Sequence, residues 1–176
     1  MAIVLPPLVQ RVSPNQSSRN GARIDLLVWH ETAGSYRSAV EWLCNPAADA
    51  SAHLVLREDG REATQLVPLA RKAWTQGAFN PRSVGLEHAN VTAKGFHSEQ
   101  QLEVSARIFG WLCLKYAIPP RWARAGAGRG ICRHLDLGAA GGGHYNCGMS
   151  DFDFGRFVEM VGDEIDRGGY KQTWLK

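Results

Sequence analysis

The chain has 176 residues, of which 44% are hydrophobic and 21% are charged, and its formal net charge at pH 7 is +3. This length and composition predict one globular domain with a proper core and exclude a disordered chain. The longest apolar runs are too short for a membrane span, and the mild positive charge suits an anionic partner without indicating nucleic acid.

The N-terminal region is not expected to act as a signal peptide. It reads MAIVLPPLVQRVSP, with no basic segment before its apolar residues and with two early prolines, which is a poor signal peptide. The four cysteines include no CxxC pair, so we expect free thiols in a protein made in a reducing cytoplasm. Residues 1–23 are rich in Pro, Ser, Asn and Arg and predict an extended arm, whereas residues 24–170 predict the domain proper.

The first predicted strand, residues 24–29, is almost continuously apolar and is therefore expected in the centre of a sheet, covered on both faces. It ends in the polar cluster His30-Glu31-Thr32, and the end of a buried strand is a common place for chemistry in an α/β sheet. Taken alone, a histidine at this position is more often a buried core residue with its hydrogen bonds satisfied than a functional group.

A helix and a hairpin are predicted next. Residues 35–44 have helical spacing and stop before Asn45-Pro46. Asp59-Gly60 separates two β-prone runs, 51–56 and 62–67, and predicts a hairpin. We expect His53, at the start of this hairpin, to be buried and hydrogen-bonded beside the site.

Residues 68–76 form a connector that carries Trp74, and residues 83–88 predict another strand. In this strand Val84, Leu86 and His88 share one face, while Gly85 and Glu87 share the other. A carboxylate in the middle of a strand is costly unless it is paired, exposed or used. Glu87 is therefore either a functional group or a surface residue of an edge strand.

Two further helices are predicted. Residues 98–116 begin with a Ser98–Gln101 capping box and end before Pro119-Pro120. A last helix begins at Ser150 with Asp153 in its first turn and stops at Gly168-Gly169. Its inward face is predicted to carry Phe154, Phe157, Val158, Val161 and Ile165.

The segment 130–154 holds the metal-capable side chains His134, His144 and Cys147. The small residues 138–143 let the backbone fold back sharply, so His134 and a residue near Cys147 can reach one point in space. A third ligand would then come from elsewhere in the chain.

Several blocks in this order resemble a known family: LLVWHETAG, ASAHLVLREDG, QLVPLARKAWTQGAFNPRSVGLEHAN, and GICRHLDL followed by NCG. The chain resembles the zinc-dependent N-acetylmuramoyl-L-alanine amidases of the type-2 amidase and peptidoglycan-recognition-protein superfamily, and more narrowly a phage endolysin catalytic domain. The resemblance implies a single α/β domain with a central mixed β-sheet flanked by helices.

The resemblance also implies one zinc ion per chain, held by two histidines and one Cys or Asp. The matching residues here are His30, His134 and Cys147. The proline that usually accompanies the third ligand is absent, since this chain reads Asn146-Cys147-Gly148, and His144 is the alternative third ligand. Imidazole nitrogen and thiolate sulfur are donors that zinc accepts, and a catalytic zinc keeps one position open beside three protein ligands.

Glu87 matches a glutamate that related cytoplasmic amidases place in a Val-Gly-Ile/Leu-Glu strand. The resemblance therefore implies that Glu87 is the general base and then the acid toward the leaving amine. Another branch of the family uses a Tyr and a Lys at positions that are Ala52 and Tyr145 here. Tyr145 is accordingly expected to be at most an oxyanion or substrate contact.

The implied substrate is peptidoglycan, cut between N-acetylmuramic acid and L-alanine. Trp74 and Asn80 lie in a block that flanks the family's groove and are expected substrate contacts, although Trp74 could equally be a core residue. His144 and Tyr145, further along the chain, are also expected to contact the substrate. We expect a monomer without membrane insertion that acts on the bacterial wall after release from the host cytoplasm. The alternatives are a non-catalytic peptidoglycan-binding module and a cytoplasmic wall-recycling amidase.

Overall fold

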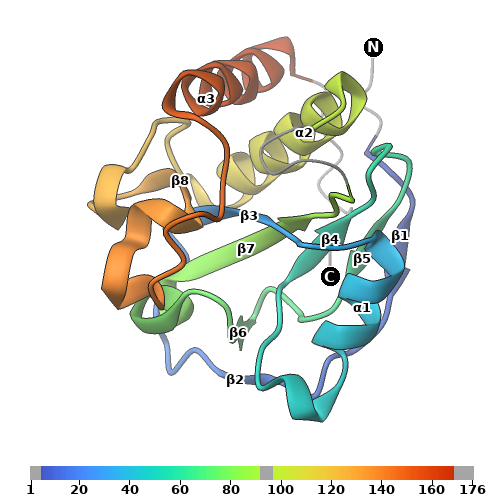
Figure 1. Cartoon of the computed structure of the whole chain (residues 1–176). Coiled ribbons are helices and arrows are strands. Elements are labelled where there is room, and N and C mark those ends of the chain that lie inside the picture. Colours follow the sequence, from blue (N-terminus) through green and yellow to red (C-terminus); the bar gives the residue numbers. More distant parts are fainter. Residues whose placement is uncertain (1–4, 92–96, 169–176) are drawn as a thin grey trace.

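A computed structural model describes residues 5–91 and 97–168 (Figure 1). Its main sheet has six strands in the order β1-β5-β4-β7-β3-β8. All neighbouring pairs are parallel except β4 and β5, which form the antiparallel hairpin. The strands are β1 (Leu8–Gln10), β3 (Leu26–Glu31), β4 (Leu54–Leu56), β5 (Ala63–Gln65), β7 (Ser83–His88) and β8 (Gly130–Arg133).

A second, two-stranded antiparallel sheet pairs β2 (Gln16–Ser18) with β6 (Arg71–Ala73). Both β1 and β2 come from the segment 1–23 that was expected to be an extended arm. From Leu8 onward this segment is paired with the rest of the fold. Arg19 is buried at its end and donates hydrogen bonds to the carbonyls of Leu69 and Ser83.

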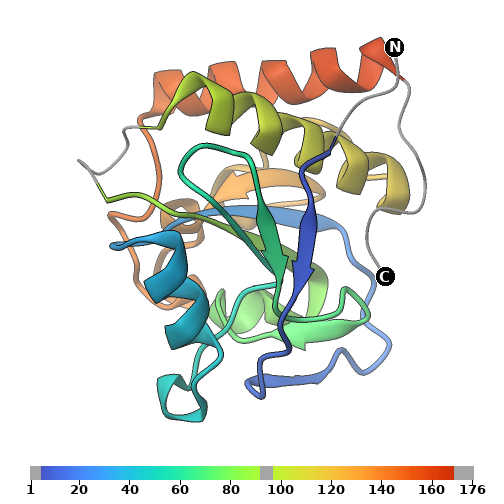
Figure 2. The ribbon, with the colours of Figure 1, turned by 90° about the vertical axis from the view of Figure 1, so that its right-hand side faces the viewer.

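Three α-helices surround the main sheet. Helices α2 (Glu99–Tyr116) and α3 (Asp151–Arg167) pack together over one face, and α1 (Tyr36–Leu43) packs near β4 away from that pair (Figure 2). Short 3₁₀ helices span Pro46–Ala48, Gly77–Arg82, Arg124–Gly126 and His134–Gly141. Within the described residues, no helix has both the length and the apolar character needed to cross a membrane.

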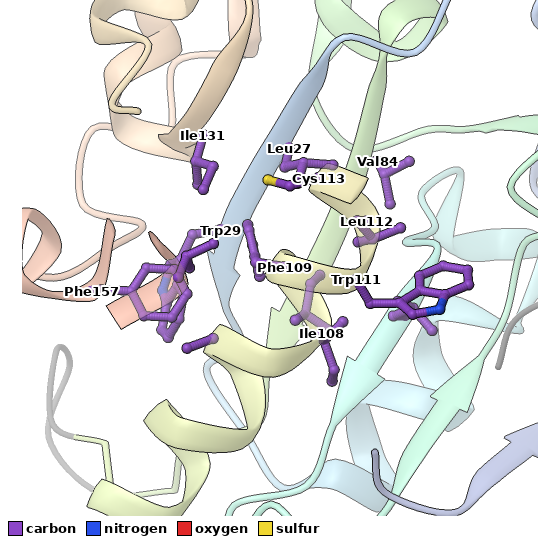
Figure 3. Close-up of a cluster of buried hydrophobic side chains, with 14 of the residues drawn as sticks. Leu27, Trp29, Val84, Ile108, Phe109, Trp111, Leu112, Cys113, Ile131 and Phe157 are labelled. Carbon is purple, nitrogen blue, oxygen red and sulfur yellow. The ribbon is translucent and has the colours of Figure 1, made fainter. Parts of the chain in front are cut away.

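The two faces of β3 and β7 have different tasks. Leu27 and Trp29 of β3 lie with Val84 of β7 in the largest buried cluster, against the side chains of α2 and α3 (Figure 3). Trp29 packs edge-on against Phe157 with ring centroids 4.7 Å apart. Since side chains alternate along a strand, the opposite face carries His30, two positions after Val28, and Glu87, two positions after Gly85.

The predicted mixed α/β fold, its hairpin and its three helices are confirmed. The capping box is half right: Ser98 Oγ accepts the N–H of Gln101, but the Gln101 amide donates to the carbonyls of Arg57 and Ala89 instead. Strands β6 and β8 were not predicted. The small-residue run lies partly in a 3₁₀ helix and takes positive φ at Gly138, Gly142 and Gly143. Gly169, and hence the predicted domain end at residue 170, lies outside the described residues.

The core predicts a large stability difference between two phenylalanines of α3. Phe157 is 1% exposed and Phe152 is 73% exposed. Phe157→Ala should lower the free energy of unfolding by about 3–5 kcal/mol, because it removes a buried ring and leaves a cavity. Phe152→Ala, the matched control, should change it by less than about 0.5 kcal/mol. Urea unfolding followed by circular dichroism measures both, and equal losses would contradict this assignment of the core.

Candidate active site

The candidate site lies where the parallel strands β3, β7 and β8 end. Parallel pairing aligns His30 with Glu87 and Trp29 with Arg133, so His134 follows directly beyond β8 at the same edge. A cavity of about 610 Å³ opens there. The carboxyl edge of parallel strands is where α/β sheets usually bind ligands.

His30, His134 and Cys147 offer one ligand atom each, and these atoms all lie within 4.8 Å of one another. The rings of His30 and His134 have centroids 4.4 Å apart. Burial lowers the pKa of both imidazoles, and for His30 it falls well below its ordinary value, with His134 as the next cause. Both rings are therefore neutral near pH 7, which leaves lone pairs for a cation.

Hydrogen bonding determines which nitrogen of His134 is available. Its Nε2 lies 2.9 Å from the carbonyl oxygen of Gly141, and because a carbonyl only accepts, Nε2 carries the proton and Nδ1 keeps the lone pair. In His30, Nδ1 lies 3.7 Å from Glu87 Oε1, while Nε2 is buried and finds no hydrogen-bond partner in the described part of the chain.

Cys147 is held by backbone contacts from two other segments. Its carbonyl accepts the N–H of Leu135 at 3.1 Å, and its sulfur accepts the N–H of Glu31 at 3.4 Å. The Leu135 bond fixes the distance between the second and third metal-capable residues. The Glu31 bond connects the third to the strand that carries the first.

Arg133 joins the two loops that carry His134 and Cys147. Its side chain is 4% exposed, pairs with Asp136 at 2.7 Å, and donates to the carbonyl of Met149 at 2.7 Å. Asp151 at the start of α3 accepts a further bond at 2.8 Å. One buried guanidinium therefore fixes the segments on both sides of the cluster.

Glu87 is 12% exposed and lines the cavity. Burial raises the pKa of this carboxyl to about 8, and the negative charge of Glu31 adds to the rise. A cation among the neighbouring ligands would oppose that shift, since an opposite charge favours the ionised form. Glu87 thus lies beside the cluster as a carboxyl whose protonation depends on its surroundings, rather than as a surface residue of an edge strand.

The other residues predicted to be in the site have different surroundings. His144 lines the cavity and stacks on His134 with centroids 4.6 Å apart, but it does not belong to the ligand cluster. Trp74 also lines the cavity and donates through Nε1 to Ser17. Tyr145 is 68% exposed and is not a lining residue. His53 is buried and accepts the N–H of Gly85, as predicted.

Asn80 has its carboxamide oxygen engaged by the backbone. Oδ1 accepts the N–H groups of Thr75 at 3.0 Å and Gln76 at 2.6 Å, and Asn80 does not line the cavity. In this structure the side chain therefore holds the loop after Trp74 in shape. The direct substrate contact expected for Asn80 has no support in this geometry.

Sequence reasoning did not single out Trp42 or Gln76, and it placed Glu31 in the polar cluster at the strand end without giving it a role. Trp42 lines the cavity and is 55% exposed; a large aromatic off the apolar stripe of a short helix is the signal that could have found it. Glu31 also lines the cavity, and its carboxylate accepts a bond from Asn90 at 2.8 Å. Gln76 is completely buried behind the cluster, and no sequence pattern indicates that position.

Taken together, the described residues form a mixed α/β protein with a cluster of three side chains that could hold a metal ion, open to a cavity, at the carboxyl edge of its sheet. Two neutral imidazoles and one thiol fit the donor set of a catalytic zinc site. The profile of the N-acetylmuramoyl-L-alanine amidase family, Amidase_2, matches residues 20–148. The chain belongs to this family.

One curated relative is similar in sequence, and solved structures are similar in fold. N-acetylmuramoyl-L-alanine amidase A of Achromobacter lyticus is 30% identical over 93 residues, which cover 52% of each chain, so the present chain spans about half the length of that relative. The structure of Staphylococcus aureus hydrolase AmiA in complex with its ligand aligns with 97% of this chain and 89% of its own, at 16% identity and a TM-score of 0.74. The structure of the N-acetylmuramoyl-L-alanine amidase LysC of Clostridium intestinale aligns with 89% of this chain and 98% of its own, at 17% identity and a TM-score of 0.66.

The buried Arg133 generates a stability prediction. Arg133→Met should lower the free energy of unfolding by about 3–5 kcal/mol, because it leaves the nearly buried carboxylate of Asp136 without its positively charged partner. Arg37→Met removes an exposed pair with Glu41 and should leave the urea midpoint close to wild type. Similar midpoints for the two variants would show that Arg133 does not hold the loops together.

Proposed function

We propose that this chain hydrolyses the amide bond between N-acetylmuramic acid and L-alanine in peptidoglycan, with one zinc ion held by His30, His134 and Cys147. The observation that carries the proposal is the convergence of these three side chains from distant parts of the sequence to within 4.8 Å. A carboxyl group and an open cavity adjoin the cluster, which is what hydrolysis of a polymer requires beyond metal binding.

When bound, a zinc ion with an open position supplies a Lewis acid for the amide carbonyl and lowers the pKa of a coordinated water to about 7. The chain's own contribution is to present neutral ligands of fixed geometry. His134 is oriented by the Gly141 carbonyl, and Cys147 is oriented by the backbone of Leu135 and Glu31.

Glu87 is the proton-transfer group in this proposal. Its carboxylate stands 3.7 Å from His30, at the edge of the cavity, so a water beside the ligands is within its reach. It removes a proton from the attacking water and returns it to the leaving amine of L-alanine, since an amine is a poor leaving group until protonated.

Two indole side chains form the apolar part of the cavity wall. Trp42 from α1 and Trp74 from the segment after β6 both line it. Aromatic faces suit sugar rings and methyl groups such as the lactyl methyl of the substrate. The cavity thus places an apolar surface for the saccharide beside the cluster that acts on the amide.

Two alternatives share this substrate. A non-catalytic peptidoglycan-binding module would lack a complete set of ligands, and the presence of all three favours an enzyme. A wall-recycling amidase would cut small soluble muropeptides, whereas a lysin cuts intact wall from outside. Comparing the release of L-alanine amino termini from purified walls and from soluble muropeptides distinguishes a wall-recycling amidase from a lysin. We retain the lysin, acting as a monomer on the bacterial wall without nucleic acid or membrane partners, as the proposal.

The identity of the third ligand is tested by two substitutions. Cys147→Ser should lose bound zinc and hydrolytic activity together, because a hydroxyl is a much weaker zinc donor than a thiolate. His144→Ala should keep one zinc per chain, since its ring stacks on His134 without joining the cluster. Zinc content by atomic emission after dialysis measures both, and the reverse pattern would assign the ligand to His144.

The role of Glu87 is tested by Glu87→Gln, which preserves size but removes the base. We expect the kcat for release of L-alanine amino termini to fall by on the order of 10²- to 10⁴-fold, with zinc content and wall binding near wild type. Glu103→Gln, on the outer surface of α2, is the control and should leave kcat unchanged. Near-full activity of Glu87→Gln would remove Glu87 from the mechanism.

A further inference from the structure

Three polar side-chain atoms in and beside the cluster of His30, His134 and Cys147 are buried without hydrogen-bond partners among the described residues. They are Nε2 of His30 and both carboxamide atoms, Nε2 and Oε1, of Gln76. Gln76 is 0% exposed and His30 is 1% exposed. Buried polar groups are nearly always paired, so three unpaired atoms in one region indicate an interaction that a change in side-chain orientation would complete.

Two of these atoms, Gln76 Nε2 and His30 Nε2, lie beside Gly85 of β7. A Cβ added to Gly85 would lie 2.5 Å from Gln76 Nε2 and 3.3 Å from His30 Nε2. The carboxamide and the imidazole therefore occupy the space that a side chain at this position would fill. Because Gly85 pairs with Val28, two positions before His30 on β3, this space adjoins the first metal-capable residue.

The chemistry of a histidine ligand says which bond belongs there. His30 directs Nδ1 toward Glu87, which lines the cavity. A neutral imidazole that gives its Nδ1 lone pair to a metal carries its proton on Nε2, and that N–H needs an acceptor. The two ends of a carboxamide have the same shape, so a half-turn of the Gln76 amide replaces Nε2 by Oε1 near this site.

We propose that Gln76 is a positioning residue whose Oε1 accepts the Nε2–H of His30, and so holds His30 in the tautomer that presents Nδ1 to the metal. The proposal rests on the zinc site of the proposed function. It gives His30 the same kind of support that the Gly141 carbonyl gives His134.

The backbone around Gln76 is built to hold this amide in place. The N–H of Gln76 donates to Asn80 Oδ1 at 2.6 Å, and its carbonyl accepts the N–H of Phe79 at 3.0 Å. Asn80 also accepts the N–H of Thr75. Asn80 therefore acts on the site indirectly: it fixes the backbone of Gln76, and Gln76 in turn orients His30.

Gln76→Leu tests the proposal, because leucine fills similar space without an acceptor. We expect zinc to bind about 10- to 100-fold more weakly, the range for removing such a partner of a metal ligand. The dissociation constant is measured by competition with a chromogenic chelator. Gln76→Glu keeps an acceptor oxygen and should bind zinc more tightly than Gln76→Leu.

Gln65→Leu is the matched control. Gln65 is 3% exposed and hydrogen-bonded to Gln10, but it lies on β5, which β4 separates from β7. It should lower the melting temperature while leaving zinc affinity unchanged. If Gln76→Leu keeps the zinc affinity of wild type, the proposal is wrong.

A second measurement uses only the wild-type protein and therefore does not depend on the folding of a variant. In the ¹⁵N-labelled wild-type protein, with and without zinc, His30 should show a protonated, slowly exchanging Nε2 in imidazole correlation spectra. An unprotonated Nε2 in both forms would overturn the proposal even if Gln76→Leu fails to fold. Wild-type protein that binds no zinc would instead refute the proposed function, which keeps the two failures distinct.

Discussion

The parallel register of β3 between β7 and β8 is the constraint on which the site depends. It aligns His30 with Glu87 across one pair and places His134 just beyond the end of the other. Side chains alternate along a strand, so the same register that buries Trp29 and Val84 under α2 and α3 directs His30 and Glu87 to the opposite face. A slip of one residue in β7 would turn Glu87 into the core and remove it from the cavity.

The core on the helix side also supports the backbone of the first ligand. The imidazole of His88 stacks on the indole of Trp29, with ring centroids 3.3 Å apart. Its Nδ1 lies 2.7 Å from the carbonyl oxygen of His30. Ser105 of α2 bonds to its other nitrogen. Burial holds the pKa of His88 well below its ordinary value, so this is a neutral donor that connects the packing of α2 to the position of His30.

Several expectations depended on order along the chain and were met because local chemistry decides them. Asp59-Gly60 fixed the hairpin, and Ser35, Ser98 and Ser150 each cap a helix by accepting the backbone N–H of the residue three positions further along. Strand β8 was missed because residues 130–133 are too short and too mixed for periodicity to show, and its pairing with β3 creates it. Likewise β6 exists only because β2 lies beside it.

The sequence by itself determined the alternation that separates the core face from the site face, and it contained the three separated blocks that supply His30, His134 and Cys147. Those features depend only on residue type and on spacing along the chain. Only the tertiary structure decided that Asn80 serves the backbone, that Trp42 borders the cavity, and that Gln76 lies behind His30. Each of these depends on contacts between residues far apart in the chain, and a hydrogen-bond partner or a cavity wall has no local pattern from which it could be predicted.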